Sequence, residues 1–214
     1  MSDNLCDKNE AVVQPALILI PDISGFTQYM KASSIAHSQV NIARLLESII
    51  DSNYLDLLVS EIEGDAILFY KFNDNSAVRD IAEQVKKMHT SFHQTLIDIN
   101  ENNDCQCGAC SLLYNLSLKF VVHYGEVGSV MVKDRCKLFG GDVIIAHRLL
   151  KNSIPLQEYV LFTDAFIKKY NTQSSLIDED FMKLEKSSDE YDVLGNIEYY
   201  FGNLNELKEN HKIL

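Results

Sequence analysis

The sequence predicts an α+β fold of the ferredoxin-like kind, in which one sheet is covered by helices. Short apolar runs bounded by polar or glycine-containing segments occur in both halves of the chain, as expected for buried strands. Residues 77–99 repeat their apolar side chains at spacings of three and four, as expected for an amphipathic helix. The expected element order, β-α-α-β-β-α-β-β-α-β-α-β, places strands from both halves in one sheet.

The N-terminal part begins with a polar segment, residues 1–13, which we expect to be a frayed tail. Residues 16–21 (ALILIP) form a continuous apolar run, the pattern of a strand buried on both faces. Ser24 can cap a helix over 25–33, and a second helix is expected over 37–53. One face of the second helix carries Ile42, Leu45, Leu46, Ile49 and Ile50.

The next segments, 54–64 and 65–72, are typical of a hairpin that turns near Glu63 and Gly64. The helix over 77–99 follows. Its apolar stripe consists of Val78, Ile81, Val85, Met88, Phe92, Leu96 and Ile99.

His89 and His93 lie four residues apart on this helix. Such a pair can bind a metal ion, but the sequence shows no third ligand nearby. Because both residues flank the apolar stripe, we expect them to be surface or boundary histidines.

The C-terminal half is predicted to hold four strands and two helices. The strands are expected at 117–125, 126–132, 158–163 and 198–204. The first two are expected to form a hairpin, and its tip continues through 133–137. The helices are expected at 143–152, closed by Asn152 and Pro155, and at 164–170. The acidic segment 171–190 is expected to be irregular.

The length of 214 residues suits one domain, expected over 14–205, with a C-terminal tail at 206–214. The formal net charge of −12 argues against nucleic acid and anionic lipid as partners, because their binders need clustered Lys and Arg. The first apolar stretch is too short to span a bilayer and has no positively charged leader. We therefore expect a soluble, cytoplasmic protein that does not bind membranes.

Asp22 follows an apolar run and Asp65 opens another, and Gly25 and Gly64 lie next to them. Carboxylates at strand ends beside glycine-containing turns are suited to holding a hard cation such as Mg²⁺ or Mn²⁺ on a polyphosphate. The alternative is that both aspartates are helix caps or turn formers.

Four motifs resemble, in order, those of the class III nucleotide cyclases, the adenylate and guanylate cyclase catalytic domains. They are PDISGFT (21–27), EIEGDAILFY (61–70), VVHYGEVGSV (121–130) and FGGDVIIAHRLLKN (139–152). The similarity covers nearly the whole chain and fits a divergent bacterial branch of the superfamily. The resemblance implies the cyclase fold, with a central, mainly antiparallel sheet covered by helices.

The resemblance also implies a two-metal site for Mg²⁺ or Mn²⁺ at Asp22, Ile23 and Asp65. In the family, such ions orient the triphosphate and activate the 3′-hydroxyl for attack on the α-phosphorus. The phosphate-binding residues would be Ser24, Gly25, Phe26 and Thr27, at a helix N-terminus. Because the family's active site is shared across a head-to-tail homodimer, we expect a homodimer that binds a nucleoside triphosphate.

The substrate half of the site departs from the family pattern. Arg148 matches the transition-state arginine, although it could also be a helix-end charge that offsets the dipole. Ile144 stands where the family has a ribose-positioning asparagine, and Leu194 stands where it has a phosphate-binding lysine. The absence of the asparagine could lower the rate on the order of 10²-fold.

Two further positions correspond to base recognition. Glu61 stands where adenylate cyclases have an adenine-selecting lysine and guanylate cyclases have a glutamate. This match favours GTP over ATP as the nucleotide. The alternative is that Glu61 is an ordinary solvated strand residue. The second base-reading position aligns with Lys137 or Cys136.

Cys105, Cys107 and Cys110 form a C-x-C-x-x-C cluster in the loop 100–110, an insertion relative to the cyclase pattern. The thiolates could bind one Zn²⁺, with a fourth ligand from Cys6, Cys136, a histidine or a partner subunit. A redox-sensing thiol pair and plain exposed thiols are the alternatives. The odd total of five cysteines fits a reducing compartment better than a disulfide framework.

These observations leave three functional hypotheses. The first is an active, metal-dependent cyclase that prefers GTP. The second is a catalytically degenerate domain that senses a nucleotide or metal, which Ile144 and Leu194 favour. The third is a thiol- or zinc-responsive module that uses the cysteine loop.

Overall fold

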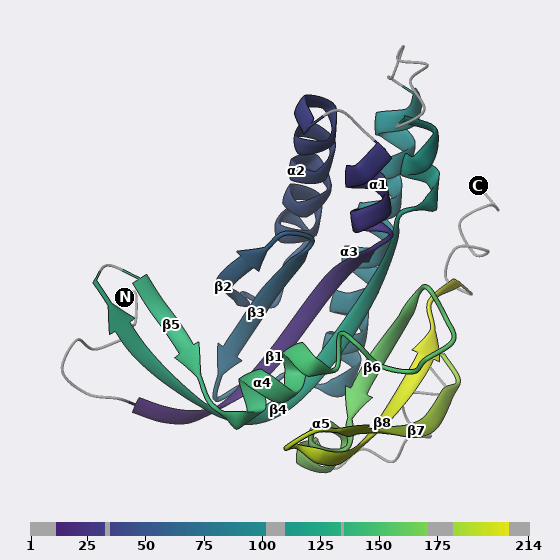
Figure 1. The fold of residues 1–214 in the computed structure, drawn as a ribbon. Helices are drawn as coiled ribbons and strands as arrows, with labels where there is room; N and C mark the ends of the chain where they lie inside the picture. The colour runs from purple at the N-terminus through teal and green to yellow at the C-terminus, as the bar shows by residue number, and fades with distance from the viewer. Residues whose placement is uncertain (1–11, 33–34, 102–109, 134, 171–181, 206–214) are drawn as a thin grey trace.

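Eight strands form one sheet at the centre of the protein, and helices cover it (Figure 1). The computed structural model describes residues 12–32, 35–101, 110–133, 135–170 and 182–205. The strands are β1 (Val12–Ser24), β2 (Leu58–Glu63), β3 (Ala66–Phe72), β4 (Ser117–Val132), β5 (Arg135–Phe139), β6 (Tyr159–Thr163), β7 (Leu184–Tyr191) and β8 (Gly195–Asn203). The helices are α1 (Phe26–Ala32), α2 (Ile35–Asp51), α3 (Val78–Glu101), the 3₁₀-helix η1 (Cys110–Asn115), α4 (Gly141–Arg148) and α5 (Asp164–Lys169).

The strand order is β2-β3-β1-β4-β6-β8-β7, and β5 pairs with the outer part of β4. The pairing of β4 with β6 is parallel, and the other pairings of the described strands are antiparallel. The predicted α+β fold with a mainly antiparallel sheet is therefore confirmed. None of the helices in the described part of the chain combines the length and apolar character needed to cross a bilayer.

β4 is one uninterrupted strand of 16 residues. The prediction of a turn between 117–125 and 126–132 is therefore wrong. Gly125 lies within the strand, and a Cβ atom there would lie 2.1 Å from Cγ of Asp142 at the start of α4. This glycine permits close approach of a neighbouring side chain rather than a change of direction. The hairpin turn comes after Val132, where β5 returns along β4.

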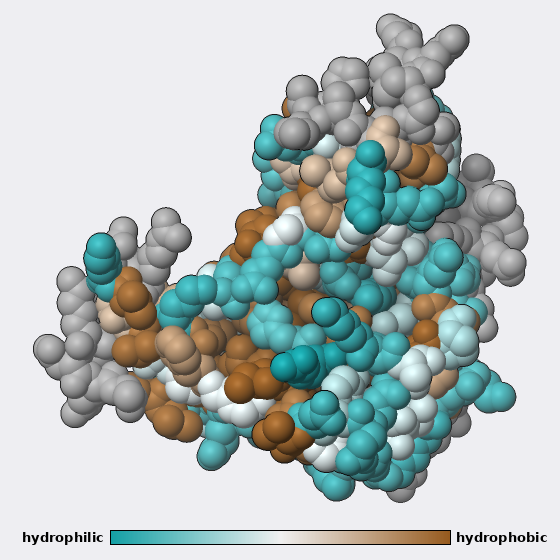
Figure 2. Space-filling model, in the orientation of Figure 1, coloured by the Kyte–Doolittle hydropathy of each residue, from teal (hydrophilic) through white to brown (hydrophobic). Residues whose placement is uncertain are grey.

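The outer part of β4, together with β5, forms an arm that also pairs with the first residues of β1 (Figure 1). Apolar side chains gather on this arm (Figure 2). Val13, Val132 and Phe139 are 63%, 52% and 54% exposed, and Val13 and Phe139 lie on either side of Gly128. We call these three residues the apolar arm. Exposed apolar groups that cluster in this way are typical of a surface that contacts another molecule.

Two strand boundaries differ from the prediction because distant segments pair with them. β1 begins at Val12, inside the segment 1–13 that was expected to be a tail, since its first residues pair with β4. The segment 171–190 was expected to be irregular, but Leu184–Tyr191 within it forms β7. Among the described strands, β7 is an edge strand that pairs with β8 alone, so its polar sequence does not need to be buried.

α4 is shorter than the predicted helix over 143–152. It ends at Arg148, and Leu149 forms its C-cap. The Asn152 side-chain amide donates hydrogen bonds to the Leu149 carbonyl oxygen at 2.6 Å and to the Tyr159 hydroxyl oxygen at 2.7 Å. Asn152 thus fastens the chain after the helix, rather than ending the helix itself.

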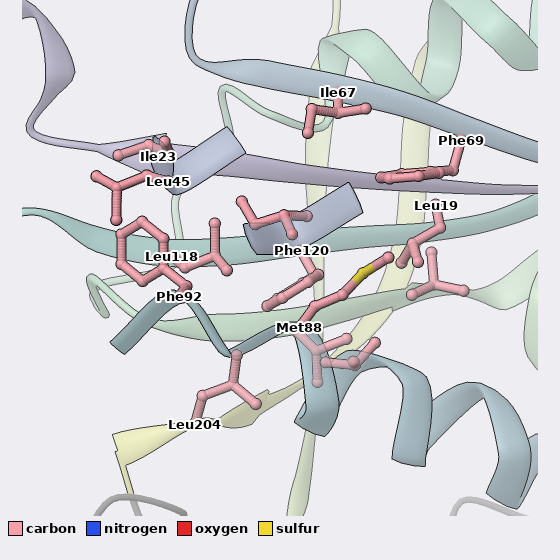
Figure 3. Packing of buried hydrophobic residues seen from close by; sticks show 14 of the residues in the cluster. Leu19, Ile23, Leu45, Ile67, Phe69, Met88, Phe92, Leu118, Phe120 and Leu204 are labelled. Atoms are coloured by element: carbon pink, nitrogen blue, oxygen red, sulfur yellow. The ribbon is translucent and has the colours of Figure 1, made fainter. Parts of the chain in front are cut away.

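The two faces of the sheet carry separate cores, because side chains alternate along each strand. Leu17, Leu19 and Ile23 of β1 belong to the core beneath α2 and α3, and Ala16, Ile18 and Ile20 belong to the core beneath α4. We call these two sides the helix face and the α4 face. Figure 3 shows Met88 and Phe92 of α3 packed near Leu118 and Phe120 of β4 on the helix face. The predicted stripe of α3 is therefore the main helical contribution to the core.

A hydrogen-bonded chain of side chains joins three elements on the α4 face. His123 Nδ1 lies 2.9 Å from Thr163 Oγ1, and its Nε2 lies 2.9 Å from Asp142 Oδ1. Thr163 also caps α5 by accepting from the Phe166 N–H, and the Glu126 N–H donates to Asp142 Oδ2 at 2.8 Å. The hydrogen bond with His123 holds the pKa of Asp142 below its ordinary value, although burial opposes this shift.

We predict that Asp142→Asn lowers the free energy of unfolding at neutral pH by about 1 kcal/mol, because charge-assisted hydrogen bonds are lost. The folded-state pKa of Asp142 is depressed, so its stabilisation is present above the unfolded-state pKa and disappears as pH falls through the folded-state pKa. Urea denaturation at a series of acidic pH values measures the free energy of unfolding. As pH falls, this free energy should decrease less steeply in the variant than in the parent protein. Asp192→Asn, in the exposed turn before β8, is the control, and a decline in Asp142→Asn as steep as in the parent would contradict the assignment.

Candidate functional site

Asp22 and Asp65 lie next to each other at the ends of adjacent strands. Asp22 is near the end of β1, where its Cα pairs with that of Ala66 in β3. The Ile23 N–H donates to the Asp65 main-chain oxygen at 3.0 Å, which ties the turn between β2 and β3 to β1. The structure therefore brings together the two carboxylates that the sequence had singled out. The side chain of Ile23 is buried in the core, so only its main chain is available to a ligand.

Lys119 of β4 completes this group of charges and is a residue that the motifs did not predict. Its Nζ lies 3.0 Å from Asp22 Oδ2 and donates to the Leu150 carbonyl oxygen at 2.9 Å. Asp22 and Lys119 are Cα partners across the β1–β4 ladder, so both side chains lie on the α4 face. The sequence feature that could have indicated a role for Lys119 is its position as a single charged residue within the apolar run SLKFVV.

The electrostatics of this group fit a bound cation. Burial raises the pKa of Asp65, the neighbouring charge of Asp22 raises it further, and Lys119 lowers it. A divalent cation between the two carboxylates would relieve their repulsion, and carboxylate oxygens are the ligands that Mg²⁺ and Mn²⁺ prefer. The Lys119 ammonium already neutralises part of this charge and therefore competes with such a cation.

The predicted phosphate-binding segment, Ser24–Thr27, lies beside the turn that carries Asp65. Gly25 has a φ of +87°, and a Cβ atom there would lie 3.1 Å from the Asn115 carbonyl oxygen, so both conformation and space favour glycine. A Cβ atom on Gly64 would lie 3.8 Å from the Phe26 ring. The turn between β2 and β3 therefore lies close to the start of α1. The first turn of α1 closes when the Tyr29 N–H donates to the Gly25 oxygen at 3.0 Å.

The two predicted base-recognition residues contact each other. The Lys137 ammonium of β5 is ion-paired with Glu61 Oε2 of β2, and His147 Nε2 of α4 lies 3.7 Å from Glu61 Oε1. Glu61 is therefore not an isolated solvated glutamate within this chain. Its carboxylate is oriented by two side chains from other elements.

Arg148 and the two residues that depart from the cyclase pattern lie on the surface or at its boundary. Arg148 is exposed at the C-terminal end of α4, two residues before Leu150, which accepts from Lys119. Ile144 is 53% exposed one helical turn earlier, on the same side of α4. Leu194 is half-buried in the turn between β7 and β8. None of the substituting side chains is hidden in the core, so each remains available to a ligand or a partner.

The cysteine cluster lies largely outside the described residues. Cys105 and Cys107 fall in the undescribed segment 102–109, and Cys110 begins η1. Cys136 is disulfide-bonded, a bond that the sequence analysis did not expect. A cysteine in a disulfide has no thiolate, so in this state Cys136 cannot be the fourth ligand of a zinc site.

The expectation that His89 and His93 are surface or boundary residues is wrong for His89, which is buried. Both imidazoles lie against the buried carboxylate of Glu158, immediately before β6. Glu158 is 65 residues away from His93 along the chain, so local sequence reasoning could not identify it as a third ligand.

Comparisons with known proteins agree with this fold. Residues 42–159 match a family model described as protein of unknown function (DUF2652). An uncharacterized protein of Mycobacterium tuberculosis, Rv2561/Rv2562, is 38% identical over 123 residues. That match covers 58% of this chain and 57% of the relative, so it spans little more than half of either protein.

Solved structures of nucleotide cyclases have the same architecture. The adenylyl cyclase CyaB from P. aeruginosa superposes with a TM-score of 0.62 at 13% identity, over 90% of this chain and 95% of the other. The guanylyl cyclase Cya2 gives 0.64 at 12% identity, over 90% and 93%. The guanylate cyclase domain of RhGC from Catenaria anguillulae, solved in complex with GTP, gives 0.58 at 16% identity, over 90% and 98%. The protein therefore has the fold of class III nucleotide cyclase domains, as the sequence motifs predicted.

We predict that Lys119→Met strengthens binding of Mn²⁺ about tenfold, because an ammonium beside Asp22 opposes a second cation there. Titration at neutral pH, followed by the electron paramagnetic resonance signal of free Mn²⁺, measures this affinity. Lys183→Met, an exposed residue before β7, is the control. Weaker binding in Lys119→Met would instead make the lysine a supporting part of the site.

Proposed function

The chain belongs to the family described as protein of unknown function (DUF2652), and we propose that it binds a nucleoside triphosphate together with divalent metal ions in the manner of a nucleotide cyclase. The main observation in support of the proposal is that Asp22 and Asp65 lie close together beside the start of α1. A carboxylate pair beside the N-terminal turn of a helix is suited to a metal-bound polyphosphate.

In this proposal, Asp22, Asp65 and the main chain of Ile23 hold Mg²⁺ or Mn²⁺. When bound, such ions neutralise the triphosphate and lower the pKa of a coordinated hydroxyl. The main chain of Ser24, Gly25, Phe26 and Thr27 binds the phosphates. In the proposal, Arg148 neutralises charge that develops on the phosphate during a reaction.

Glu61 and Lys137 recognise the base. A carboxylate accepts hydrogen bonds from the N1–H and exocyclic amine of guanine, whereas adenine presents an acceptor at N1. Lys137 and His147 hold the Glu61 carboxylate in one orientation, which reduces the entropy lost on binding. GTP is therefore the expected nucleotide.

A homodimer would complete the site and cover the apolar arm. The guanylyl cyclase domain of the RhoGC fusion protein from Blastocladiella emersonii has been solved as a non-canonical dimer and as a monomer. Phe139 of the apolar arm is two residues after Lys137 on β5, and Ile144 is a further exposed apolar residue on α4. We propose that a second copy covers this surface and shares the nucleotide.

The reaction that this site would support is cyclisation, in which the ribose 3′-oxygen bonds to the α-phosphorus and pyrophosphate leaves. Ile144 cannot position the ribose by a hydrogen bond, and Leu194 cannot bind the triphosphate as an ammonium would. Each loss lowers the rate on the order of 10²-fold by comparison with other positioning groups. Turnover is therefore slow, and nucleotide binding is the main property.

The second candidate is a regulatory module that binds the nucleotide or metal without turnover. The exposed Ile144 and the ion pair between Lys119 and Asp22 favour it. A thiol- or zinc-responsive role for Cys105, Cys107 and Cys110 is a further candidate, which the pattern of the cysteines favours.

We predict that the purified protein binds GTP in the presence of Mn²⁺ and that Asp22→Asn and Asp65→Asn each weaken this binding at least about tenfold. Isothermal titration calorimetry with each of the four ribonucleoside triphosphates, with and without Mn²⁺, measures this. Asp51→Asn, an exposed aspartate at the end of α2, is the control. If no triphosphate binds, or if both site variants bind as the parent does, the proposal is wrong.

We predict that Ile144→Asn combined with Leu194→Lys raises formation of cyclic GMP by roughly 10²-fold or more, because both changes restore positioning groups. Mass spectrometry of cyclic monophosphates after incubation with Mn²⁺ and GTP detects the product. Asp65→Asn in the same background should remove the gain. If the repaired protein binds GTP and forms no product, the domain is a binding module.

We predict that Phe139→Glu weakens the dimer at least about tenfold, since a charge would be buried against an apolar surface. Sedimentation velocity across a concentration series measures the dissociation constant. Tyr114→Glu, at a 71% exposed aromatic in η1, is the matched control. A parent protein that stays monomeric at all concentrations would exclude the shared site.

A further inference from the structure

Two histidines and a glutamate converge on the helix face. His93 Nε2 lies 2.7 Å from Glu158 Oε1, and His89 Nε2 lies 3.5 Å from Glu158 Oε2. One ligand atom from each of the three residues lies within 4.8 Å of the other two. Asp22, by contrast, lies on the α4 face, so this cluster is on the other side of the sheet from the aspartate pair.

Four parts of the fold hold the cluster in place. The two histidines are one helical turn apart on α3, and the burial of Met88 and Phe92 fixes the rotation of that helix. Glu158 is fastened from both sides. The Leu118 N–H of β4 donates to its Oε1 at 3.3 Å, and its main-chain oxygen accepts from the Leu204 N–H at 3.2 Å.

The burial of the cluster is asymmetric. The side chains of Glu158 and His89 are each 2% exposed, whereas that of His93 is 20% exposed. A carboxylate removed from water needs a positive charge or a metal close by. His93 is the partly exposed edge of the cluster, so an ion would reach the cluster from the side of His93.

We propose that His89, His93 and Glu158 form a mononuclear binding site for Zn²⁺. Two imidazoles and one carboxylate are a common ligand set for this ion, with water in the fourth position. Ideal Zn–N and Zn–O lengths place ligand atoms about 3.4 Å apart around a tetrahedral ion. The two histidine nitrogens lie 2.7 Å and 3.5 Å from the Glu158 carboxylate oxygens, on either side of this value.

The ligand types distinguish this site from the candidate metal sites at the aspartate pair and at the cysteine cluster. Nitrogen donors favour Zn²⁺ and similar transition metals, whereas the oxygen ligands at Asp22 and Asp65 favour Mg²⁺ and Mn²⁺. The site contains no thiolate, so it is chemically distinguishable from zinc at Cys105, Cys107 and Cys110. A bound ion would fasten α3 to β6 and would bind only the folded chain, which raises its stability.

The test uses the full chain with Cys105→Ser, Cys107→Ser and Cys110→Ser, which we call the triple-serine protein. Equilibrium dialysis with Zn²⁺ and elemental analysis should find one ion per chain. Co²⁺ in place of Zn²⁺ should give visible d–d absorption without the near-ultraviolet charge-transfer band of a thiolate ligand. Added Zn²⁺ should also raise the melting temperature above that measured in EDTA.

His93→Asn and Glu158→Gln in the triple-serine protein should each weaken Zn²⁺ binding at least about tenfold and remove the rise in melting temperature. His147→Asn and Asp98→Asn are matched controls outside the cluster, and they should bind Zn²⁺ as the triple-serine protein does. Circular dichroism in EDTA establishes that each variant is folded. His93 is partly exposed, so its variant is the one best tolerated by the core.

If the triple-serine protein, with both histidines intact, binds neither Zn²⁺ nor Co²⁺, the proposal is wrong. Binding that survives in both His93→Asn and Glu158→Gln would also overturn it. In either case the cluster would be a hydrogen-bonded support for α3 with no metal.

Discussion

The register between β1 and β4 is the constraint on which the rest of the structure depends. The two strands pair from Val12↔Ser129 to Ser24↔Ser117, and β1 is buried on both faces over much of its length. This register places Lys119 beside Asp22. A slip of one residue would turn every side chain of β1 to the opposite face and would separate the charges that define the candidate site.

The sequence predicted what depends on local pattern. The run at 16–21, the stripe of α3 and the proximity of Asp22 to Asp65 all follow from periodicity and motif order, and the structure contains each of them. Lys119 and Glu158 were missed because their roles come from residues far away in the chain. Gly125 was misread for the same reason, since the Asp142 side chain that needs its space is 17 residues later.

The candidate nucleotide site and the surface around it differ in how they are built. The aspartates, Lys119 and the start of α1 are held by backbone pairing and by turns that require glycine. The positions that depart from the cyclase pattern, Ile144 and Leu194, lie on outer elements where substitution costs little stability. A fold of this kind can therefore keep its metal-binding geometry while its substrate contacts change.

Two consecutive residues of β4 serve opposite faces of the sheet. The Leu118 N–H donates to Glu158 on the helix face, and the Lys119 side chain contacts Asp22 on the α4 face. Two neighbouring residues of one strand therefore contact the histidine cluster and the aspartate pair. A displacement of this part of β4 would alter both contacts, because the Leu118 main chain and the Lys119 side chain are separated by about the length of one residue along the strand.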